Sequence, residues 1–531
     1  MILLTAGTIS ARSTELSVTL ESFIRTQLGD TSGVIDPKCG TRYDMMIHAF
    51  PEQVDPDLRQ SYLQLKMAAP VREKSLLSPS GGFMLHWDES GPNAVPLTDK
   101  SANGIPDYID SAAVIFDYVR YREVEQMGYQ APPAQNGEPA VPYHIYFSEL
   151  AYYGLTSPSY VDIPSLPGVN YSSYIEVEND YLGFDTPGLD GLRVTAAHEF
   201  HHAIQLGYNI DFNDEYFWEM TSTWMEEVLY PAINDYINYL YDLFNSVSNT
   251  RFTLVNGEYP YANSLYLQMI SSQYGVDIVR MIWEHIKSAP SLTAIRQVLQ
   301  EKNTSWAASL GEYGMWLYYT GERTMPGLFY NDAALFPQIR IRPVDEIRFD
   351  NSFGGQINVE ENANRYIQFS QISGNILNID VVADGKTAGF RGLTRFTYSE
   401  FHPANDPLLN QFVDDDLMIV ILTNAEDNAQ SFDLSLTTDS FPVTSEIYPF
   451  PNPLDMNKTH ALRFQNVPAS ASLYIYNVAG DRIRIVEANG SSSIRTWNLT
   501  NERAEPVQAG IYLYVVEHEG ARRMGKFSIL H

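Results

Sequence analysis

The chain has 531 residues, a formal net charge of −31 at pH 7 and a pI near 4.6. This acidity excludes nucleic-acid binding, because the chain repels phosphate backbones. The 44% share of hydrophobic residues indicates a globular protein, and the length indicates roughly three or four domains. No run of about 20 apolar residues exists, so no membrane span is predicted. The single cysteine, Cys39, excludes an intrachain disulfide.

The N-terminal region, residues 1–80, is predicted to be mostly helical, with ESFIRTQLGD and DPDLRQSYLQLKMA as candidate helices. Its position indicates a propeptide or an N-terminal support. We expect Cys39 to be a buried small residue, and the alternative is a latency thiol that blocks a metal. The opening residues MILLTAGTIS lack a basic start and a long apolar stretch, so they predict no signal peptide.

A candidate calcium loop covers residues 99–110, after the strand-like FMLHW. Oxygen side chains stand at alternating loop positions, Gly104 stands where an EF-type loop turns sharply, and the last ligand is Asp instead of Glu. The predicted Ca²⁺ ligands are Asp99, Ser101, Asn103, Ile105 through its carbonyl, Asp107 and Asp110. The alternative is an Asp/Asn-rich turn that caps the following helix. We expect calcium to supply rigidity, not chemistry.

The sequence VTAAHEFHHAIQLGY contains a His-Glu-x-x-His motif. On a helix, His198 and His202 share one face, so both imidazoles can hold one metal ion, and Glu199 can act as general base. This arrangement predicts a zinc hydrolase, whereas the alternative is a surface helix with clustered histidines. We expect His201 to flank the site, and Asp190 is a candidate helix cap.

A third zinc ligand is expected in the acidic segment EYFWEMTSTWMEEVLYP. The candidates are Glu215, Glu219, Glu226 and Glu227; for the last two the alternative is a solvated helix face, which we favour for Glu227. The stretch from Glu219 to Glu226 resembles the E-G-F-A-T-Y-x-E segment of gluzincin aminopeptidases, with Met220 replacing the glycine. This resemblance implies that Glu219 is the third ligand. Residues 80–330 more closely resemble a bacterial group of secreted metalloproteases with HEFFHA-like and ATWMEE-like segments.

The gluzincin resemblance also implies a tyrosine that stabilises the oxyanion. The segment GEYPYANSLYLQMI offers Tyr259, which we favour by spacing, and Tyr261. Zincin domains further have an edge strand along which an extended substrate can add, and VPYHIYF (141–147) is the candidate. Helices are predicted near 232–246, 262–287, 291–302 and 305–320.

The C-terminal part changes character. Residues 338–440 alternate in short segments, beginning with IRIRPV, and predict a β-sandwich. A linker, EIYPFPNP, leads into residues 446–531, which resemble C-terminal immunoglobulin-like modules of bacterial secreted proteins, including type IX sorting domains. That resemblance rests on Tyr448, Asn452, Gly480 and Gly510 with their neighbours, and it implies export by secretion machinery.

Together these features predict an α+β multidomain protein: an N-terminal region (1–80), a zincin-like peptidase domain (81–330) and two all-β sandwich domains (338–440 and 446–531). The predicted function is a secreted, zinc-dependent metalloendopeptidase in which Glu199 activates water to cleave peptide or protein substrates. We expect Zn²⁺ and Ca²⁺ as cofactors, a monomer, and a bacterial protein that is secreted or on the cell surface. The alternative function is a cell-surface calcium-binding adhesion protein with a vestigial or structural zinc site.

Overall fold

The computed structural model forms two compact units: Met1–Leu243 with Thr253–Thr304, and Phe244–Phe252 with Ser305–His531. Each unit is described by itself. The structure describes residues 6–30, 38–66, 68–166, 168–325, 327–372, 375–385, 387–395, 398–406, 409–413, 416–439, 447–457, 459, 461–468, 470–486, 494–518 and 521–530.

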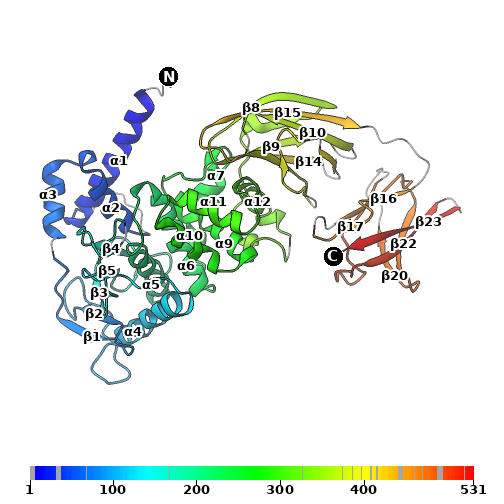
Figure 1. Ribbon diagram of the computed structural model, residues 1–531. Helices are drawn as coiled ribbons and strands as arrows, with labels where there is room; N and C mark the ends of the chain where they lie inside the picture. Colours follow the sequence, from blue (N-terminus) through cyan, green and yellow to red (C-terminus); the bar gives the residue numbers. More distant parts are fainter. Residues whose placement is uncertain are drawn as a thin grey trace. The chain divides into compact units, whose positions relative to one another are not determined.

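The N-terminal region is helical, as predicted, and consists of α1 (Ala6–Gln27), α2 (Thr41–Ala49) and α3 (Pro56–Leu65) (Figure 1). Asp55 caps α3 by accepting hydrogen bonds from two backbone N–H groups, and Pro56 occupies the first turn. The three helices share a small apolar core, to which the rest of the unit contributes two buried residues, Tyr152 and Leu155. This region therefore has a core of its own, and α2 also packs against β4.

A five-stranded sheet follows, in the order β1 (Lys74–Leu77), β2 (Phe83–Trp87), β3 (Tyr143–Ser148), β5 (Ser173–Glu178) and β4 (Gly154–Pro158). The predicted strand VPYHIYF is confirmed as β3, but the prediction that it forms the edge is wrong. β5 pairs with β3 on one side and with β4 on the other, so β4 is the edge strand. Strand order depends on long-range pairing, which the local alternation of residues does not encode.

Seven further helices of the first unit are α4 (Asp107–Arg120), α5 (Gly188–Gln205), α6 (Glu215–Leu229), α8 (Tyr259–Ala262), α9 (Ser264–Tyr274), α10 (Asp277–Ile286) and α11 (Ser291–Glu301). α5 packs against α4, α6, β4 and β5. Its N-cap is Pro187, so the prediction of Asp190 as the cap is wrong. Asp190 lies inside the first turn and pairs with Arg193. α7 (Tyr241–Ser246) spans the boundary between the two units.

The second unit starts with α12 (Trp306–Tyr318), which packs on strands of the following β region. The predicted peptidase region, 81–330, therefore extends past the boundary of the first unit at Thr304. The segment IRIRPV (339–344) is not a strand. Its last two residues begin a short 3-10 helix, Pro343–Asp345, which precedes β7 (Glu346–Arg348). Proline removes a donor that a strand interior needs.

Two sheets form the first β region, antiparallel except for the parallel pair β7–β9, and the region has one apolar core. One has the order β13 (Leu409–Val413), β10 (Asn375–Ala383), β15 (Gln430–Asp439), β8 (Ser352–Val359). The other has the order β12 (His402–Pro403), β11 (Ala388–Leu393), β14 (Leu417–Asn424), β9 (Ala363–Ser370), β6 (Thr250–Arg251), and β7 pairs with β9.

The last β region also has two sheets and its own core. They are β16 (Tyr448–Phe450), β18 (Leu462–Gln465), β21 (Arg495–Trp497), and β17 (Leu454–Asp455), β23 (Ala521–Leu530), β22 (Gly510–His518), β19 (Ser472–Asn477), β20 (Arg482–Val486). The predicted linker 446–453 contains β16, and its first residue lies outside the described residues. Within the described part of the chain, no helix is both long and apolar enough to cross a bilayer.

Candidate metal centre

The three predicted zinc ligands meet between α5 and α6. The Nε2 atoms of His198 and His202 lie 3.1 Å apart, and Glu219 Oε2 is 3.2 Å from the first and 3.5 Å from the second. All three side chains are buried. The two histidines are one helical turn apart on α5, and α6 crosses beside that turn to supply the carboxylate. The structure therefore brings together the residues that the sequence selected as ligands.

Neighbouring side chains fix which nitrogen of each histidine faces the centre. Nδ1 of His198 is 2.7 Å from Glu226 Oε1 and donates to that carboxylate. Nδ1 of His202 donates to Gln205 Oε1 at 2.8 Å. The Gln205 amide nitrogen, which has two hydrogens, lies 2.9–3.0 Å from three acceptor oxygens on α6, and this leaves the amide oxygen for the imidazole. Both Nε2 atoms therefore present lone pairs to a metal, and the outer hydrogen bonds hold the rings in place.

The electrostatics of the pocket favour a cation. Burial opposes charge on His198, but hydrogen bonds to Glu219 and Glu226 raise its pKa to about 9. Burial likewise opposes charge on Glu219, yet the two histidines hold its pKa well below the usual range. Glu219 Oε1 is buried and has no hydrogen-bond partner among the described residues. A buried carboxylate oxygen without a donor calls for a cation, so the donor set fits a metal ion.

Glu199, the predicted general base, lies beside this centre and below the edge strand. Its Oε2 accepts hydrogen bonds from Thr156 Oγ1 at 2.8 Å and from Thr41 Oγ1 at 2.9 Å. Gly154 on β4 makes this close approach possible, because a Cβ there would stand 2.7 Å from Glu199 Cγ and from Thr195 Cγ2. The glycine thus sets the spacing between the edge strand and the carboxylate.

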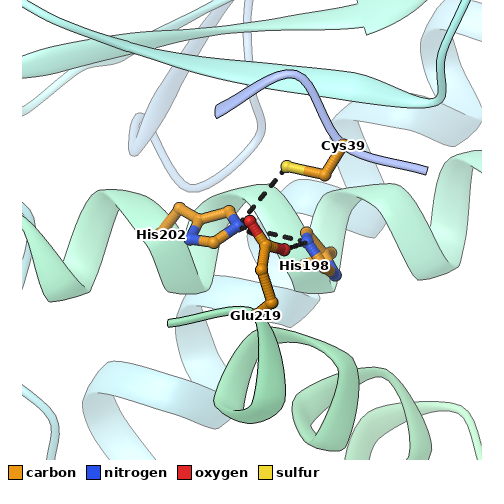
Figure 2. Close-up of side chains that lie close together, drawn as sticks. All are labelled: Cys39, His198, His202 and Glu219. Atoms are coloured by element: carbon orange, nitrogen blue, oxygen red, sulfur yellow. Dashed lines mark hydrogen bonds and ion pairs between the residues drawn. The ribbon is translucent and has the colours of Figure 1, made fainter. Parts of the chain in front are cut away.

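Cys39 is the fourth member of the ligand group (Figure 2). It is fully buried, which confirms the prediction of burial. Its Sγ lies 3.3 Å from Glu199 Oε1 and 3.5 Å from His202 Nε2. One ligand atom from each of Cys39, His198, His202 and Glu219 lies within 4.8 Å of the others, as the converging side chains in Figure 2 show. Burial and the nearby carboxylates raise the pKa of the thiol.

His201 points away from the centre, as predicted for a flanking residue. Its Nδ1 is 2.8 Å from Glu123 Oε2, and both side chains are fully buried. Burial lowers the pKa of His201 and raises that of Glu123, so the pair is neutral. His201 therefore joins α5 to the π-helix Tyr121–Gln126, which follows α4.

The two candidate tyrosines differ in position. Tyr261 packs in one buried cluster with Cys39 and Tyr239, and its ring centroid lies 6.2 Å from that of His198. Tyr259, which was favoured by spacing, begins α8 and is buried outside this cluster, where burial raises its pKa. The geometry therefore points to Tyr261 as the tyrosine beside the centre.

The candidate calcium loop is exposed and holds itself together. Asp99 accepts hydrogen bonds from the N–H groups of Asn103 and Gly104, and Gly104 has the left-handed φ of 82° that the sharp turn needs. Asn103 donates to Asp110 across the loop at 2.9 Å. Among described residues, the Cys39–His198–His202–Glu219 set alone brings three or more such ligand atoms within 4.8 Å. The calcium site stays a prediction, as do Ser101, Ile105 and Asp107 as its other ligands.

Sequence reasoning missed the residues that hold the centre from outside. Glu226 is buried, so the alternative of a solvated face is wrong for it; its position seven residues after Glu219, on nearly the same helix face, was the available signal. Gln205 follows His202 by one turn. Lys38 and Thr41 carry no local pattern beyond flanking the single cysteine of the chain.

Comparison with known proteins adds a family without a known role. Residues 188–315, which include α5 and α6, match the model of a family described as "Family of unknown function (DUF6055)". No curated protein matches the chain.

Solved structures resemble parts of the chain. They include PorZ, a surface component of the type IX secretion system of Porphyromonas gingivalis (18% identity, TM-score 0.15, 21% of this chain, 15% of that chain). Another is the BSP domain of a biofilm-associated protein (10% identity, TM-score 0.15, 31% of this chain, 27% of that chain). A third is dimeric latent PorU from Porphyromonas gingivalis (15% identity, TM-score 0.13, 35% of this chain, 19% of that chain). The chain thus spans 15% to 27% of the length of these structures.

Proposed function

We propose that this protein is a zinc-dependent peptidase of the gluzincin type, with its site on α5 and α6. One observation carries the proposal: the Nε2 atoms of His198 and His202 and an oxygen of Glu219 converge within 3.5 Å, with Glu199 on the same helical turn. These three residues would hold the metal. When bound, zinc supplies Lewis acidity, which polarises a carbonyl and acidifies water.

The other residues of the site have roles that follow from their positions. Glu199, next in sequence to a ligand, accepts the proton of the attacking water and returns it to the leaving amine. β4 is the last strand of its sheet, and an extended peptide can add along its edge once residues 39–41, which pair with Gly154 and Thr156, are displaced. Tyr261 is the candidate donor to the oxyanion. Because a strand edge accepts the middle of a peptide as well as its end, we favour an endopeptidase.

The competing function is a binding or adhesion protein with a closed, structural zinc site. One observation favours it: Cys39 gives the centre a fourth protein ligand, and structural zinc sites are closed by four such ligands. The two functions differ in whether Cys39 can leave the centre while the metal stays.

Hydrolysis of casein and of a peptide library tests the proposal. The full chain is assayed intact and after limited proteolysis, with bound metal measured in each sample and a chelator as control. We expect chelator-sensitive cleavage, and we expect Glu199→Gln to retain the metal while losing turnover by roughly 100-fold or more. Equal cleavage by Glu199→Gln contradicts the general-base role, and metal without cleavage by any form favours the binding protein.

We also propose that the protein is exported to the cell surface or the medium. The motif residues of the C-terminal module support this, since they resemble type IX sorting domains. Fractionation of cells that express the chain with and without residues 447–531 tests it: loss of export on truncation is the expected result, and unchanged export contradicts it.

A further inference from the structure

The segment Lys38–Arg42 is buried beside the proposed catalytic site, between β4, α5 and α6, although it belongs to the N-terminal region. Lys38, Cys39, Thr41 and Arg42 are each at most 6% exposed. Their partners lie more than 100 residues further along the chain, on β4, α5 and α6. Five consecutive residues, two of them basic, are thus placed where a hydrolase must admit its substrate.

The segment contacts the two parts of the site that a peptide substrate would use, the carboxylate of Glu199 and the edge of β4. Cys39 and Thr41 donate to the two carboxylate oxygens of Glu199. Gly40 N–H donates to Gly154 O at 2.9 Å, and Cys39 pairs with Gly154 in a parallel bridge, which covers the free edge of β4. Thr156 N–H donates to Thr41 Oγ1 at 2.8 Å. With the segment in place, neither the base nor the strand edge is open.

Two basic side chains anchor the segment to buried carboxylates. Lys38 Nζ pairs with Glu226, at 2.8 Å, and with Asp235, and it lies over the rings of Tyr153 and Tyr239. Arg42 donates to Gly257 O at 3.1 Å and lies 3.7 Å from Glu215. Buried carboxylates need cationic partners, so the two basic side chains of the segment and the carboxylates that they contact are complementary in charge.

The connection to the rest of the chain is exposed. Residues 68–73 form no helix or strand, and Val71 is 90% exposed. Arg72 is bound to Phe147 O and Ser148, so the accessible part lies before it. The helices α1–α3 share a core of mostly their own residues, and side-chain contacts such as Lys66–Glu176 at 2.9 Å and Tyr160–Asp44 at 2.7 Å also hold the region on the rest of the unit.

We propose that Lys38–Arg42 is a built-in inhibitor of the proposed catalytic site, with the Cys39 sulfur as fourth metal ligand, and that a cut within residues 68–71 releases it. This inference rests on the proposed peptidase function. The cut is a hydrolysis by an external protease: one water adds across one peptide bond and leaves a new carboxylate and a new amino terminus. Departure of the segment then frees the fourth ligand position, Glu199 and the edge of β4 together.

Cobalt substitution tests the ligand without measuring activity. The full chain is loaded with one Co²⁺, and its absorption is recorded for a thiolate-to-cobalt charge-transfer band. Because the chain has one cysteine, such a band can come from Cys39 alone. We expect the band in the intact chain and its loss, with cobalt still bound, in Cys39→Ser and after the cut. Thermal melting confirms that Cys39→Ser folds, and Thr41→Ser, which keeps the hydroxyl, is the matched control that retains the band.

Activity of the same samples separates the two proposals. We expect peptide hydrolysis to rise about 100-fold or more on cutting, since a tethered ligand acts at an effective concentration on the order of millimolar. If the intact chain binds cobalt without the charge-transfer band and already hydrolyses peptides, the inhibitor proposal is overturned and the peptidase proposal stands. The band without hydrolysis by any form overturns both, and makes Cys39 a structural ligand. Loss of cobalt from Cys39→Ser also overturns the inhibitor.

Discussion

The two predicted metal sites were both read from residue spacing, and they differ in what surrounds them. At the centre on α5 and α6, the ligands are buried, and His198 and His202 each donate to a defined acceptor. At the loop of residues 99–110, similar oxygen side chains are exposed or only partly buried, and Asp99 binds the backbone of its own turn. Burial makes the difference: a buried polar group needs a partner, whereas an exposed one has water. The first site is therefore fixed by its surroundings, and the second by its own sequence.

Removal of a ligand from the buried centre has the largest expected effect. Glu219→Gln keeps the volume of the side chain and removes the charge that the two histidines face. We expect the affinity for zinc to fall by more than the 10–100-fold typical of residues that only orient a ligand, measured by competition with a chromophoric chelator. Glu301→Gln, at a partly exposed His285 pair, is the control and changes nothing. Unchanged affinity in Glu219→Gln would remove this residue from the ligand set.

Glu226→Ala tests whether the buried hydrogen bond from His198 Nδ1 to Glu226 contributes to stability and to metal affinity. The change leaves Lys38 and His198 without a shared carboxylate. We expect a loss of about 3–5 kcal/mol in the free energy of unfolding, as for other broken buried pairs, and zinc affinity about 10–100-fold weaker. Denaturant unfolding and metal competition measure the two effects. Its neighbour Glu227 is partly exposed, so Glu227→Ala is the control, with a cost of about 1 kcal/mol or less. Equal costs for both would contradict the role of Glu226.

The centre shows how far the sequence reaches. The helical period places His198, Glu199 and His202 together, and the spacing within α6 selects Glu219, so the core of the site was predictable from local pattern. The insertion of Lys38–Arg42 was not, because the partners of Cys39 lie 160 and more residues away and no periodicity encodes them. The prediction that β3 is the edge strand was wrong for the same reason: β5 lies between β3 and β4, and strand order is a long-range property.

Gly154→Ala sharpens the comparison at the level of a single methyl group. The added Cβ would stand 2.7 Å from Glu199 Cγ, so the carboxylate or the edge strand must shift. If the proposed peptidase function holds, we expect peptide hydrolysis by the cut chain to fall about tenfold to 100-fold, with zinc retained, because small misplacements of a reacting group are costly. Gly354→Ala on β8, where a Cβ meets open space, is the matched control. Full turnover in Gly154→Ala would show that Glu199 tolerates displacement and would weaken its role as a positioned base.

The exposed loop carries the smallest expected effect. Without calcium, Asp99→Asn should lower the melting temperature only slightly, because the one amide oxygen of asparagine still accepts from one of the two N–H groups that the two oxygens of Asp99 accept. With calcium, titration calorimetry of the full chain should show one site with a dissociation constant on the order of 10⁻⁴–10⁻³ M, as in extracellular modules, and Asp99→Asn should abolish it. Binding heat that survives Asp99→Asn would assign the calcium to another place. An absence of calcium binding in both proteins would mean that the loop is only a turn before α4, held by its own hydrogen bonds. Burial of the ligand residues would then be the feature that separates the proposed metal site from a loop with a similar residue pattern.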